Sequence, residues 1–281
     1  MKLGDTLEEL LDAAVVRLDR RPYAYETSHP LEELEVELED GRTLCLLRKD
    51  LGTAPAKRPS FLHDPAREIE IYRCVLEAPD LRTAKFYGAA DKQLYIEKVE
   101  GSELWQHGEL EAWQRAARWL AGMHAALGDQ TDQPHLLRYD RDFYRLWLAR
   151  AEAISGDLGL VASIYEDVVE RLLALPQGLI HGDFYPSNIL VAESRICPVD
   201  WELSAAGPLL LDLAALTTGW PDGDVEAIAD AYGEVSSEAL DLCRLHLAVR
   251  WLGWSEDWTP PTEHARDWRR EAQAVAERLA V

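Results

Sequence analysis

Three side chains with oxygen-bearing groups lie at short spacings in one stretch of the chain. Asp183 is followed five residues later by Asn188, and Asp200 comes twelve residues after Asn188. An amide and a carboxylate are hard oxygen ligands that suit Mg²⁺, which prefers a few protein oxygens together with phosphate oxygens. The carboxylate of Asp183 beside them can accept a proton from an attacking hydroxyl. These residue types indicate a general base next to a magnesium site.

A β-hairpin is expected to hold these groups together. Ile189–Val191 and Ile196–Val199 are short apolar segments, and a polar stretch, Ala192–Arg195, lies between them. This pattern predicts two strands with the acidic groups at the mouth of the hairpin. A base, then an Asn, then a hairpin and a second Asp is the layout of the protein-kinase catalytic loop and its metal-binding aspartate.

The combined motifs resemble one group of proteins. H-G-D-x-x-x-x-N at His181–Asn188 and V-D-W-E at Val199–Glu202 resemble the aminoglycoside phosphotransferase and choline kinase group of small-molecule kinases, and Gly207–Ala214 resembles the downstream helix of that group. The resemblance implies an α+β, bilobal protein-kinase-like fold, with a small β-rich N-lobe and a larger, mainly helical C-lobe. It implies a nucleotide-binding N-lobe at residues 1–100. Residues 101–281 would form the C-lobe, with the catalytic loop and the acceptor-binding helices.

The resemblance also implies a reaction. ATP or GTP, bound with Mg²⁺, would donate its γ-phosphate to a hydroxyl of a small molecule, such as a cationic aminoglycoside or amino sugar. Asp183 would be the catalytic base, and Asn188 and Asp200 would hold the metal. His181 would fix the loop through hydrogen bonds, and Glu202 would be a further metal or loop contact.

Two other classes of protein stay open. One is a catalytically silent kinase-like nucleotide-binding regulatory protein, although all the catalytic residue types are present in the chain. The other is a metal-dependent hydrolase that uses His181, Asp183 and Asp200. A hydrolase site needs more clustered His ligands than the sequence offers, and oxygen ligands of the magnesium type fit these residues better.

In the family, a strand Lys anchors the nucleotide phosphates and a helix Glu orients it. For the Lys we favour Lys49 over its neighbour Arg48, whose side chain points to the opposite face of an alternating strand. For the Glu we favour Glu68 over Glu70, because it aligns better with the family's Arg-Glu pattern. The two glutamates lie roughly 200° apart on a helix, so only one can face the site.

Further nucleotide contacts are implied at two places. The usual Gly-rich loop is absent, and Glu26–Leu31 stands in its place. The resemblance implies phosphate contacts by Ser28 or Thr27, and a plain hairpin turn is the alternative. Glu97–Gly101 resembles the hinge, in which the backbone of Glu97 and Val99 would bind the base, and Gly101 would let the chain cross to the second lobe.

The first hundred residues give the pattern of strands and helices that a kinase N-lobe needs. The capping-box pattern that starts at Thr6 predicts a helix over Thr6–Arg20. Alternation then predicts strands at Leu34–Leu38 and Thr43–Lys49, joined by a turn at Asp40-Gly41. Asp64-Pro65 opens a second helix as N-cap and first turn. Two short strands follow, near Ala84–Tyr87 and Leu94–Lys98.

The remaining chain reads as mainly helical. Helices are predicted at Glu109–Leu127, Arg141–Ile154 and Val161–Ala174, and a short strand at Leu179-Ile180 leads into the catalytic loop. His124 lies on a buried helix face and is interpreted as a core histidine. Asp212 is expected to brace the catalytic loop through backbone hydrogen bonds. Four residues near the C-terminus are candidate acceptor contacts, with core packing as the alternative for the tryptophans: Trp254, Glu256, Asp257 and Trp258.

The composition indicates a globular cytoplasmic protein. The 281 residues, 47% of them hydrophobic, suffice for two lobes with a sizeable core. The chain has no run of about twenty apolar residues that would predict a transmembrane helix, and its first residues lack the features of a signal peptide. The four cysteines are scattered without a C-x-x-C pair, which fits a reducing cytoplasm and argues against a zinc site.

The formal net charge of −22 bears on partners. It argues against nucleic acid and anionic membranes, because phosphate groups need a basic surface. The expected partners are a nucleoside triphosphate and a small-molecule acceptor. An acidic field can draw in a cationic acceptor, but acidic surfaces commonly serve solubility alone, so the charge leaves the acceptor open.

Overall fold

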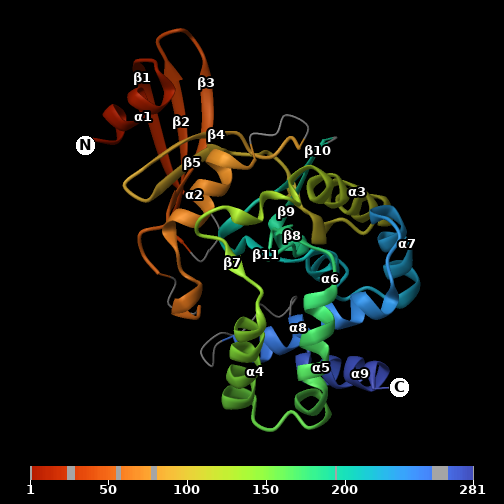
Figure 1. Cartoon of the computed structure of the whole chain (residues 1–281). Helices are drawn as coiled ribbons and strands as arrows, with labels where there is room; N and C mark the ends of the chain where they lie inside the picture. The colour runs from red at the N-terminus through yellow and green to blue at the C-terminus, as the bar shows by residue number, and fades with distance from the viewer. Residues whose placement is uncertain are drawn as a thin grey trace.

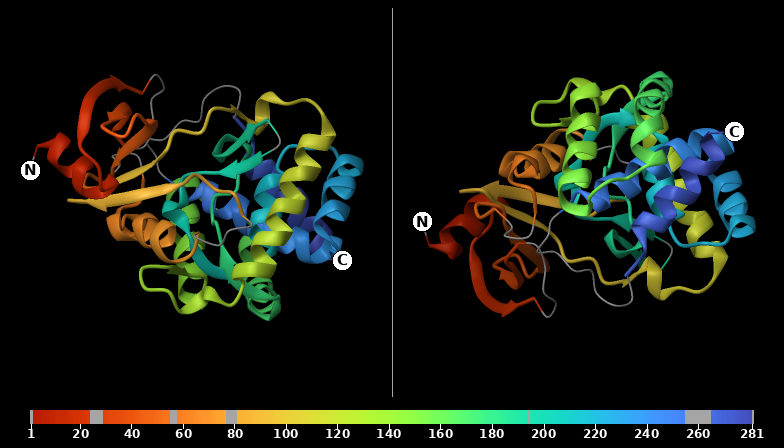
Figure 2. Two further views of the ribbon diagram at one scale, coloured as in Figure 1. Left: turned by 90° about the horizontal axis from the view of Figure 1, so that it is seen from above. Right: turned by 90° about the horizontal axis from the view of Figure 1, so that it is seen from below.

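The computed structural model describes residues 2–23, 29–54, 58–76, 81–193, 195–254 and 265–280. An N-terminal sheet lies at one end of the molecule, and most of the helices gather at the other (Figure 1). The views from above and below show the same separation, with the two termini at opposite ends (Figure 2). Ser28, Thr27, Glu256, Asp257 and Trp258, which the sequence suggested as nucleotide or acceptor contacts, lie outside the described residues.

The N-terminal sheet is antiparallel throughout, with the order β1-β2-β3-β5-β4. The strands are β1 (Val15–Pro22), β2 (Leu31–Leu38), β3 (Thr43–Asp50), β4 (Phe86–Ala90) and β5 (Gln93–Glu97). The alternation in β2 is as expected, with Leu34, Val36 and Leu38 buried. Gly41, in the β2–β3 turn, has φ +83°, a conformation that glycine adopts without strain. As the central strand, β3 is fixed on both sides, which makes it a rigid support for Lys49.

The predicted helix over Thr6–Arg20 is wrong. Helix α1 (Leu3–Leu11) ends at Asp12, which adopts the left-handed conformation with φ 48° and ψ 43°. The chain then continues as β1, which pairs with β2 from Val15 onward. The apolar residues that suggested one long helix belong to two elements, α1 and β1. The second half forms a strand because the edge of β2 offers it backbone hydrogen bonds.

Helix α2 (Pro65–Cys74) begins as expected. Asp64 is its N-cap, and its side chain accepts a hydrogen bond from the Ala66 amide at 2.9 Å, with Pro65 in the first turn. The helix buries Arg67 and Glu68 on the side that faces residues 181–204, the stretch that holds the motifs predicted to be catalytic (the catalytic segment). The cap fixes where the helix starts, and Glu68 is the glutamate that this helix buries.

Two small sheets and seven further α-helices, with short 3-10 turns between elements, make up the rest of the described regular structure. The helices are α3 (Leu110–Leu127), α4 (Arg141–Ser155), α5 (Leu160–Ala174), α6 (Leu210–Leu216), α7 (Asp222–Tyr232), α8 (Ser237–Leu252) and α9 (Trp268–Leu279). The sheets have the orders β10-β9-β6 and β7-β11-β8, built from β6 (Ser102–Glu103), β7 (Leu137–Arg138), β8 (Gln177–Ile180), β9 (Ile189–Ala192), β10 (Arg195–Pro198) and β11 (Ala205–Pro208). The expected hairpin is present, since Ile189 pairs with Pro198 in the β9–β10 ladder.

Two hydrophobic clusters hold these elements. The smaller one joins α1 to the sheet and consists of Leu7, Leu34, Val36, Leu38, Leu46 and Tyr95. The larger one runs from α2 through the catalytic segment to α9. It packs the aromatic ring of Trp119 against Phe184, with ring centres 5.9 Å apart, so the catalytic loop rests on the main core. Within the described part of the chain, no helix has both the length and the apolar character needed to cross a bilayer.

Candidate active site

The loop between β8 and β9 begins with a turn that only glycine fits. Gly182 has φ +78°, and a Cβ placed on it would lie 2.1 Å from the carbonyl oxygen of Leu203. Asp212, in the first turn of α6, accepts hydrogen bonds from the amides of His181 at 2.7 Å and Gly182 at 2.9 Å. This confirms Asp212 as the residue that braces the loop.

His181 binds backbone through both ring nitrogens. Because a carbonyl can only accept, Nε2–H donates to Val199 O at 3.0 Å, and Nδ1 accepts from the Asp183 amide at 3.3 Å. Burial lowers the pKa of His181, in keeping with this neutral form. With both nitrogens in use, His181 is a poor metal ligand, which disfavours the hydrolase. His124 is a core histidine as expected, with hydrogen bonds to Tyr232 and Asp212.

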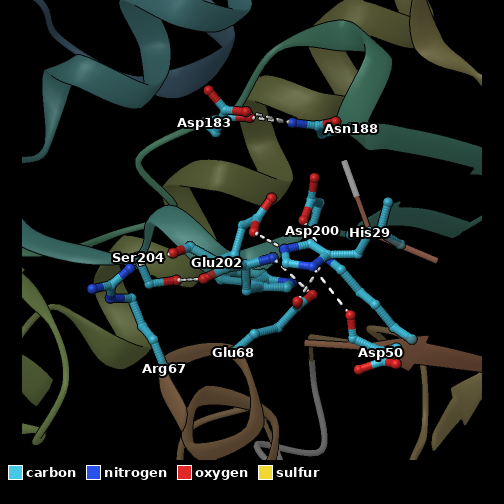
Figure 3. Close-up of polar contacts among 12 residues, drawn as sticks. His29, Asp50, Arg67, Glu68, Asp183, Asn188, Asp200, Glu202 and Ser204 are labelled. Carbon is cyan, nitrogen blue, oxygen red and sulfur yellow. Dashed lines mark hydrogen bonds and ion pairs between the residues drawn. The ribbon is translucent and has the colours of Figure 1, made fainter. Parts of the chain in front are cut away.

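Asp183 is held by a donor on each oxygen. Asn188 Nδ2–H donates to Oδ2 at 2.9 Å (Figure 3), and Arg250 Nη2–H donates to Oδ1 at 3.1 Å. Burial raises the pKa of Asp183, and the positive charge of Arg250 opposes that rise. The carboxylate therefore has a fixed orientation and a neighbouring cation that favours its ionised form.

The β9–β10 hairpin brings Asn188 and Asp200 to one mouth, as the sequence predicted. The Val199 amide donates to Asn188 O at 2.9 Å, which continues the ladder one step beyond the strands. Asp200 follows in the left-handed conformation, with φ 66° and ψ 60°. In Figure 3 it lies between the Asp183–Asn188 pair and the side chain of Glu68, with the Glu202 side chain beside it.

Lys49 reaches into this site from β3. Its Nζ lies 2.7 Å from Glu68 Oε2 and 2.5 Å from Asp200 Oδ1. Burial disfavours the charged amine, but the carboxylates of Asp200 and Glu68 outweigh burial and raise the pKa of Lys49. The Trp201 amide donates to the other oxygen of Glu68 at 3.2 Å. The ion pair between Lys49 and Glu68 therefore joins β3, α2 and the catalytic segment.

The two rival residues face elsewhere. Arg48 pairs with Glu32 on the opposite face of the sheet and donates to Gln93 Oε1 at 2.8 Å. Glu70 pairs with Arg73 along its own helix. Of the alternatives weighed from the sequence, the structure thus brings Lys49 and Glu68 together at the site and leaves the others outside it.

Glu202 is buried in a second charged cluster. Its Oε2 lies 2.8 Å from Nε2 of His29 and also pairs with Arg58. Burial alone would raise the pKa of Glu202, but Lys49, His29 and Arg58 hold it well below its ordinary value. The carbonyl of Glu202 accepts from Arg67 Nη1–H at 2.7 Å.

Arg67 makes two further bonds of the same kind. It donates to the carbonyl oxygens of Leu62 at 2.8 Å and His135 at 2.6 Å. One buried guanidinium therefore ties α2 to the catalytic segment and to the loop before β7 (Leu137–Arg138).

Asn188 and Asp200 are the described side chains that fit a metal. The amide nitrogen of Asn188 is committed to Asp183, so the carbonyl end of that side chain is the part left for a cation. The described residues contain no group of three or more His, Cys, Asp and Glu that could hold a metal ion. Two protein oxygens completed by phosphate oxygens suit Mg²⁺.

The proposed hinge begins at Glu97, the last residue of β5. The Glu97 side chain pairs with Arg195 of β10 at 2.7 Å, and Val99 is buried. Gly101 passes so close to β9 that a Cβ there would lie 2.8 Å from Val191 O. This crossing explains a glycine at the point where the chain leaves the sheet.

The sequence interpretation missed Arg250, Arg58 and His29. Arg250 has a visible signal, because a charged residue stands beside Val249 on a helix whose apolar stripe predicts burial.

Trp254, a candidate acceptor contact from the sequence, lies in the core. Its side chain is 6% exposed and stacks on Trp147, with ring centres 5.9 Å apart.

Comparisons with known proteins agree with this geometry. The sequence model of the phosphotransferase enzyme family matches residues 67–252, more than half of the chain. A search of curated protein sequences gives no match. Among solved structures, the choline kinase LicA from Streptococcus pneumoniae is 15% identical with a TM-score of 0.66, covering 99% of this chain and 97% of that one.

Two other solved structures have the same fold. A protein from Thermobifida fusca assigned provisionally as a fructosamine-3-kinase is 20% identical with a TM-score of 0.65, covering 99% of this chain and 98% of its own. A spectinomycin phosphotransferase in complex with ADP and spectinomycin is 14% identical with a TM-score of 0.60, covering 100% and 98%. The chain therefore belongs to the phosphotransferase enzyme family, has its bilobal protein-kinase-like fold, and is a small-molecule phosphotransferase.

Proposed function

We propose that the protein transfers the γ-phosphoryl group of ATP or GTP, bound with Mg²⁺, to a hydroxyl of a small molecule. The observation that carries this proposal is the position of Lys49, which bridges Glu68 of α2 and Asp200 of the catalytic segment. A cation held between those two elements is suited to anchor nucleotide phosphates beside a metal ligand.

The nucleotide would bind to residues 1–100. Lys49, oriented by Glu68, would contact the phosphates, and the backbone of Glu97 and Val99 would meet the base. The relative crystallised with ADP supports a nucleotide co-substrate. Ser28 remains a proposed phosphate contact from the sequence alone.

The metal would be held by Asn188 and Asp200. When bound, Mg²⁺ would neutralise charge on the phosphate oxygens as the phosphoryl group leaves the nucleotide. Asp200 is engaged by Lys49 through Oδ1, and its side chain is 29% exposed, so the carboxylate is accessible to a second cation.

Asp183 would orient the acceptor hydroxyl and accept its proton. Phosphoryl transfer has a loose transition state, so positioning and charge stabilisation contribute most of the catalysis. The hydrogen bonds from Asn188 and Arg250 fix both oxygens of Asp183, which provides that positioning before the acceptor arrives.

The acceptor would bind to residues 101–281. The sequence favoured a cationic aminoglycoside or amino sugar, but each of three carboxylates at the site already has a cationic partner. Asp183 pairs with Arg250, Asp200 with Lys49, and Glu202 with Arg58. Neutral sugars and nucleosides therefore belong in the same set of candidate acceptors as choline, aminoglycosides and amino sugars, which are cationic.

The test is phosphate transfer from Mg·ATP and Mg·GTP across those acceptors, with the Asp183→Asn variant alongside. We expect one acceptor class to be phosphorylated, and Asp183→Asn to lower turnover by about 10²–10⁴-fold with nucleotide binding nearly intact. Substantial turnover in the variant would contradict the base assignment. Tight Mg·nucleotide binding without transfer to any acceptor would favour the regulatory protein instead.

A further inference from the structure

Arg250 joins the last turn of α8 to the catalytic loop. Its side chain is 2% exposed, and its Nη2–H donates to Asp183 Oδ1 at 3.1 Å. Its Nη1–H donates to Gly182 O at 2.7 Å and lies 3.2 Å from the Tyr139 hydroxyl. One planar guanidinium therefore binds the side chain of Asp183 and the carbonyl of the residue before it.

The next residue of α8 makes a second link to the same loop. Trp251 Nε1–H donates to the hydroxyl of Tyr185 at 2.6 Å, and Tyr185 stands two residues after Asp183. The guanidinium of Arg250 also lies 5.9 Å from the ring centres of both Trp251 and Trp254. The end of α8 thus contacts the loop on both sides of Asp183.

These contacts determine what Arg250 can do. A guanidinium with 2% exposure, already bonded to three oxygens, is not available to an incoming acceptor. Its position instead fixes the rotation of the Asp183 carboxylate and balances its charge in a buried place. A base that is misplaced by even an ångström costs about 10²-fold in rate, so a residue that fixes the base has a measurable role.

We propose that Arg250 is a positioning residue that acts through Asp183, and that α8 sets the geometry of the base through it. The inference rests on the proposed function, in which Asp183 receives the proton of the acceptor hydroxyl. Arg250 binds Oδ1 of Asp183 and Asn188 binds Oδ2, and the hydrogen bonds of Arg250 within the described residues include neither Lys49 nor Asp200.

Arg150 offers a matched control. It comes from α4 and donates to the carbonyl oxygens of Gly253 at 2.9 Å and Trp254 at 3.0 Å. It therefore ties down the same end of α8, but its hydrogen bonds within the described residues do not involve the catalytic loop. Arg150→Met removes an arginine from this end of the helix and leaves the bonds of Asp183 in place.

The first measurement is amide hydrogen exchange in the free protein, which does not require catalysis. Arg250→Met is expected to increase exchange over residues 181–185, and Arg150→Met is expected to leave that segment as protected as in the wild type. Equal protection of the segment in wild type and Arg250→Met would overturn the proposal, as would equal loss in both variants.

The second measurement is kinetic. Arg250→Met is expected to lower kcat by about 10²-fold while the KM for the nucleotide stays unchanged, and added guanidinium is expected to restore activity where sodium at equal ionic strength does not. Arg250→Lys, which keeps the charge but cannot bridge the same oxygens, covers the case in which Arg250→Met fails to fold. A parallel rise in nucleotide KM, or a loss that guanidinium does not recover in either variant, would overturn the proposal.

The two proposals fail in different ways. If the wild type transfers no phosphate to any acceptor, the proposed reaction is wrong, and the exchange data still decide whether Arg250 positions Asp183. If the wild type is active and Arg250→Met exchanges and turns over normally, only the role of Arg250 is wrong.

Discussion

His29 Nε2 and Glu202 Oε2 lie 2.8 Å apart, although 173 positions separate the two residues in the sequence. The other ring nitrogen of His29 lies 3.1 Å from Asp50 O, so the histidine links the chain ahead of β2 and the end of β3 to the catalytic segment. Arg58 adds its charge to the same carboxylate. A buried carboxylate with these partners holds together parts of the chain that carry Lys49 and Asp200.

Arg58→Met is expected to destabilise the protein. It removes one partner of a buried charge, which costs about 3 kcal/mol because Glu202 keeps its own desolvation. Urea unfolding measures the change. Arg42→Met is the control, since Arg42 pairs with Asp40 at the surface, where solvent screens the pair and the loss should be small. Equal, small losses in both variants would show that the cluster around Glu202 contributes little.

Lys49→Met is expected to weaken Mg·nucleotide binding about 10–100-fold, the cost of losing charged hydrogen bonds to phosphate. Arg48→Met is expected to leave binding unchanged, because neighbouring strand residues point to opposite faces and Arg48 pairs with Glu32. Calorimetry on the two variants compares adjacent residues of one strand. If Lys49→Met binds Mg·nucleotide normally and Arg48→Met does not, Arg48 and not Lys49 is the residue that anchors the phosphates.

Gly182→Ala is expected to abolish phosphate transfer and to destabilise the protein. The added methyl group would meet Leu203 O at 2.1 Å in a backbone with φ +78°, so the turn that carries Asp183 must move. Gly122→Ala is the opposite control, because nothing lies within 4 Å of its Cβ position and alanine favours a helix by about 1 kcal/mol over glycine. Thermal unfolding and turnover separate the two, and an active, stable Gly182→Ala would mean that the loop tolerates another turn.

The folded protein is expected to lose stability in acid because it buries His246 in its neutral form. The Tyr165 hydroxyl and His246 Nδ1 lie 2.7 Å apart, and burial, with Arg250 nearby, holds the pKa of His246 well below its ordinary value in the folded protein. The unfolded chain binds a proton below pH ~6.5 and the folded chain does not. Stability should therefore be complete above that pH and fall below it by up to about 1.4 kcal/mol per unit.

The check is urea unfolding of the wild type and His246→Gln between pH 7.5 and 5.5. The variant lacks the titrating ring, so its stability should decline less steeply with falling pH. His181, whose pKa is also lowered by burial, contributes a slope of the same sign to both proteins. Parallel slopes for wild type and variant would contradict the assignment to His246.

The catalytic segment could be predicted because its information is local. The spacing of Asp183, Asn188 and Asp200 with two apolar strands between them determines a hairpin, and the structure contains it. Alternation along β3 separates Lys49 from Arg48, and the helical angle separates Glu68 from Glu70. In each case a short-range periodicity showed that only one of the two residues can face the site, and the family's pattern supplied the choice of Lys49 and Glu68.

The failures have a common cause in contacts between distant parts of the chain. The residues of β1 fit a helix equally well until β2 offers them a partner. His29 and Arg58 are ordinary polar residues in the sequence, and only the fold brings them to Glu202. For Arg250 the sequence pattern predicts only that the residue is buried. Its partner, Asp183, can be identified only from the structure, in which α8 packs against the catalytic loop.

The bonds of Arg67 have a consequence for which substitutions the chain tolerates. All three of its acceptors are main-chain carbonyls, those of Leu62, His135 and Glu202. A carbonyl is present whatever side chain its residue carries, so mutation at those three positions leaves the acceptors intact. The bonds of Arg67 therefore place no demand on the side chains at these three positions, which are limited only by their other contacts, such as those of Glu202 with His29 and Arg58. A substitution of Arg67 itself would remove all three bonds at once.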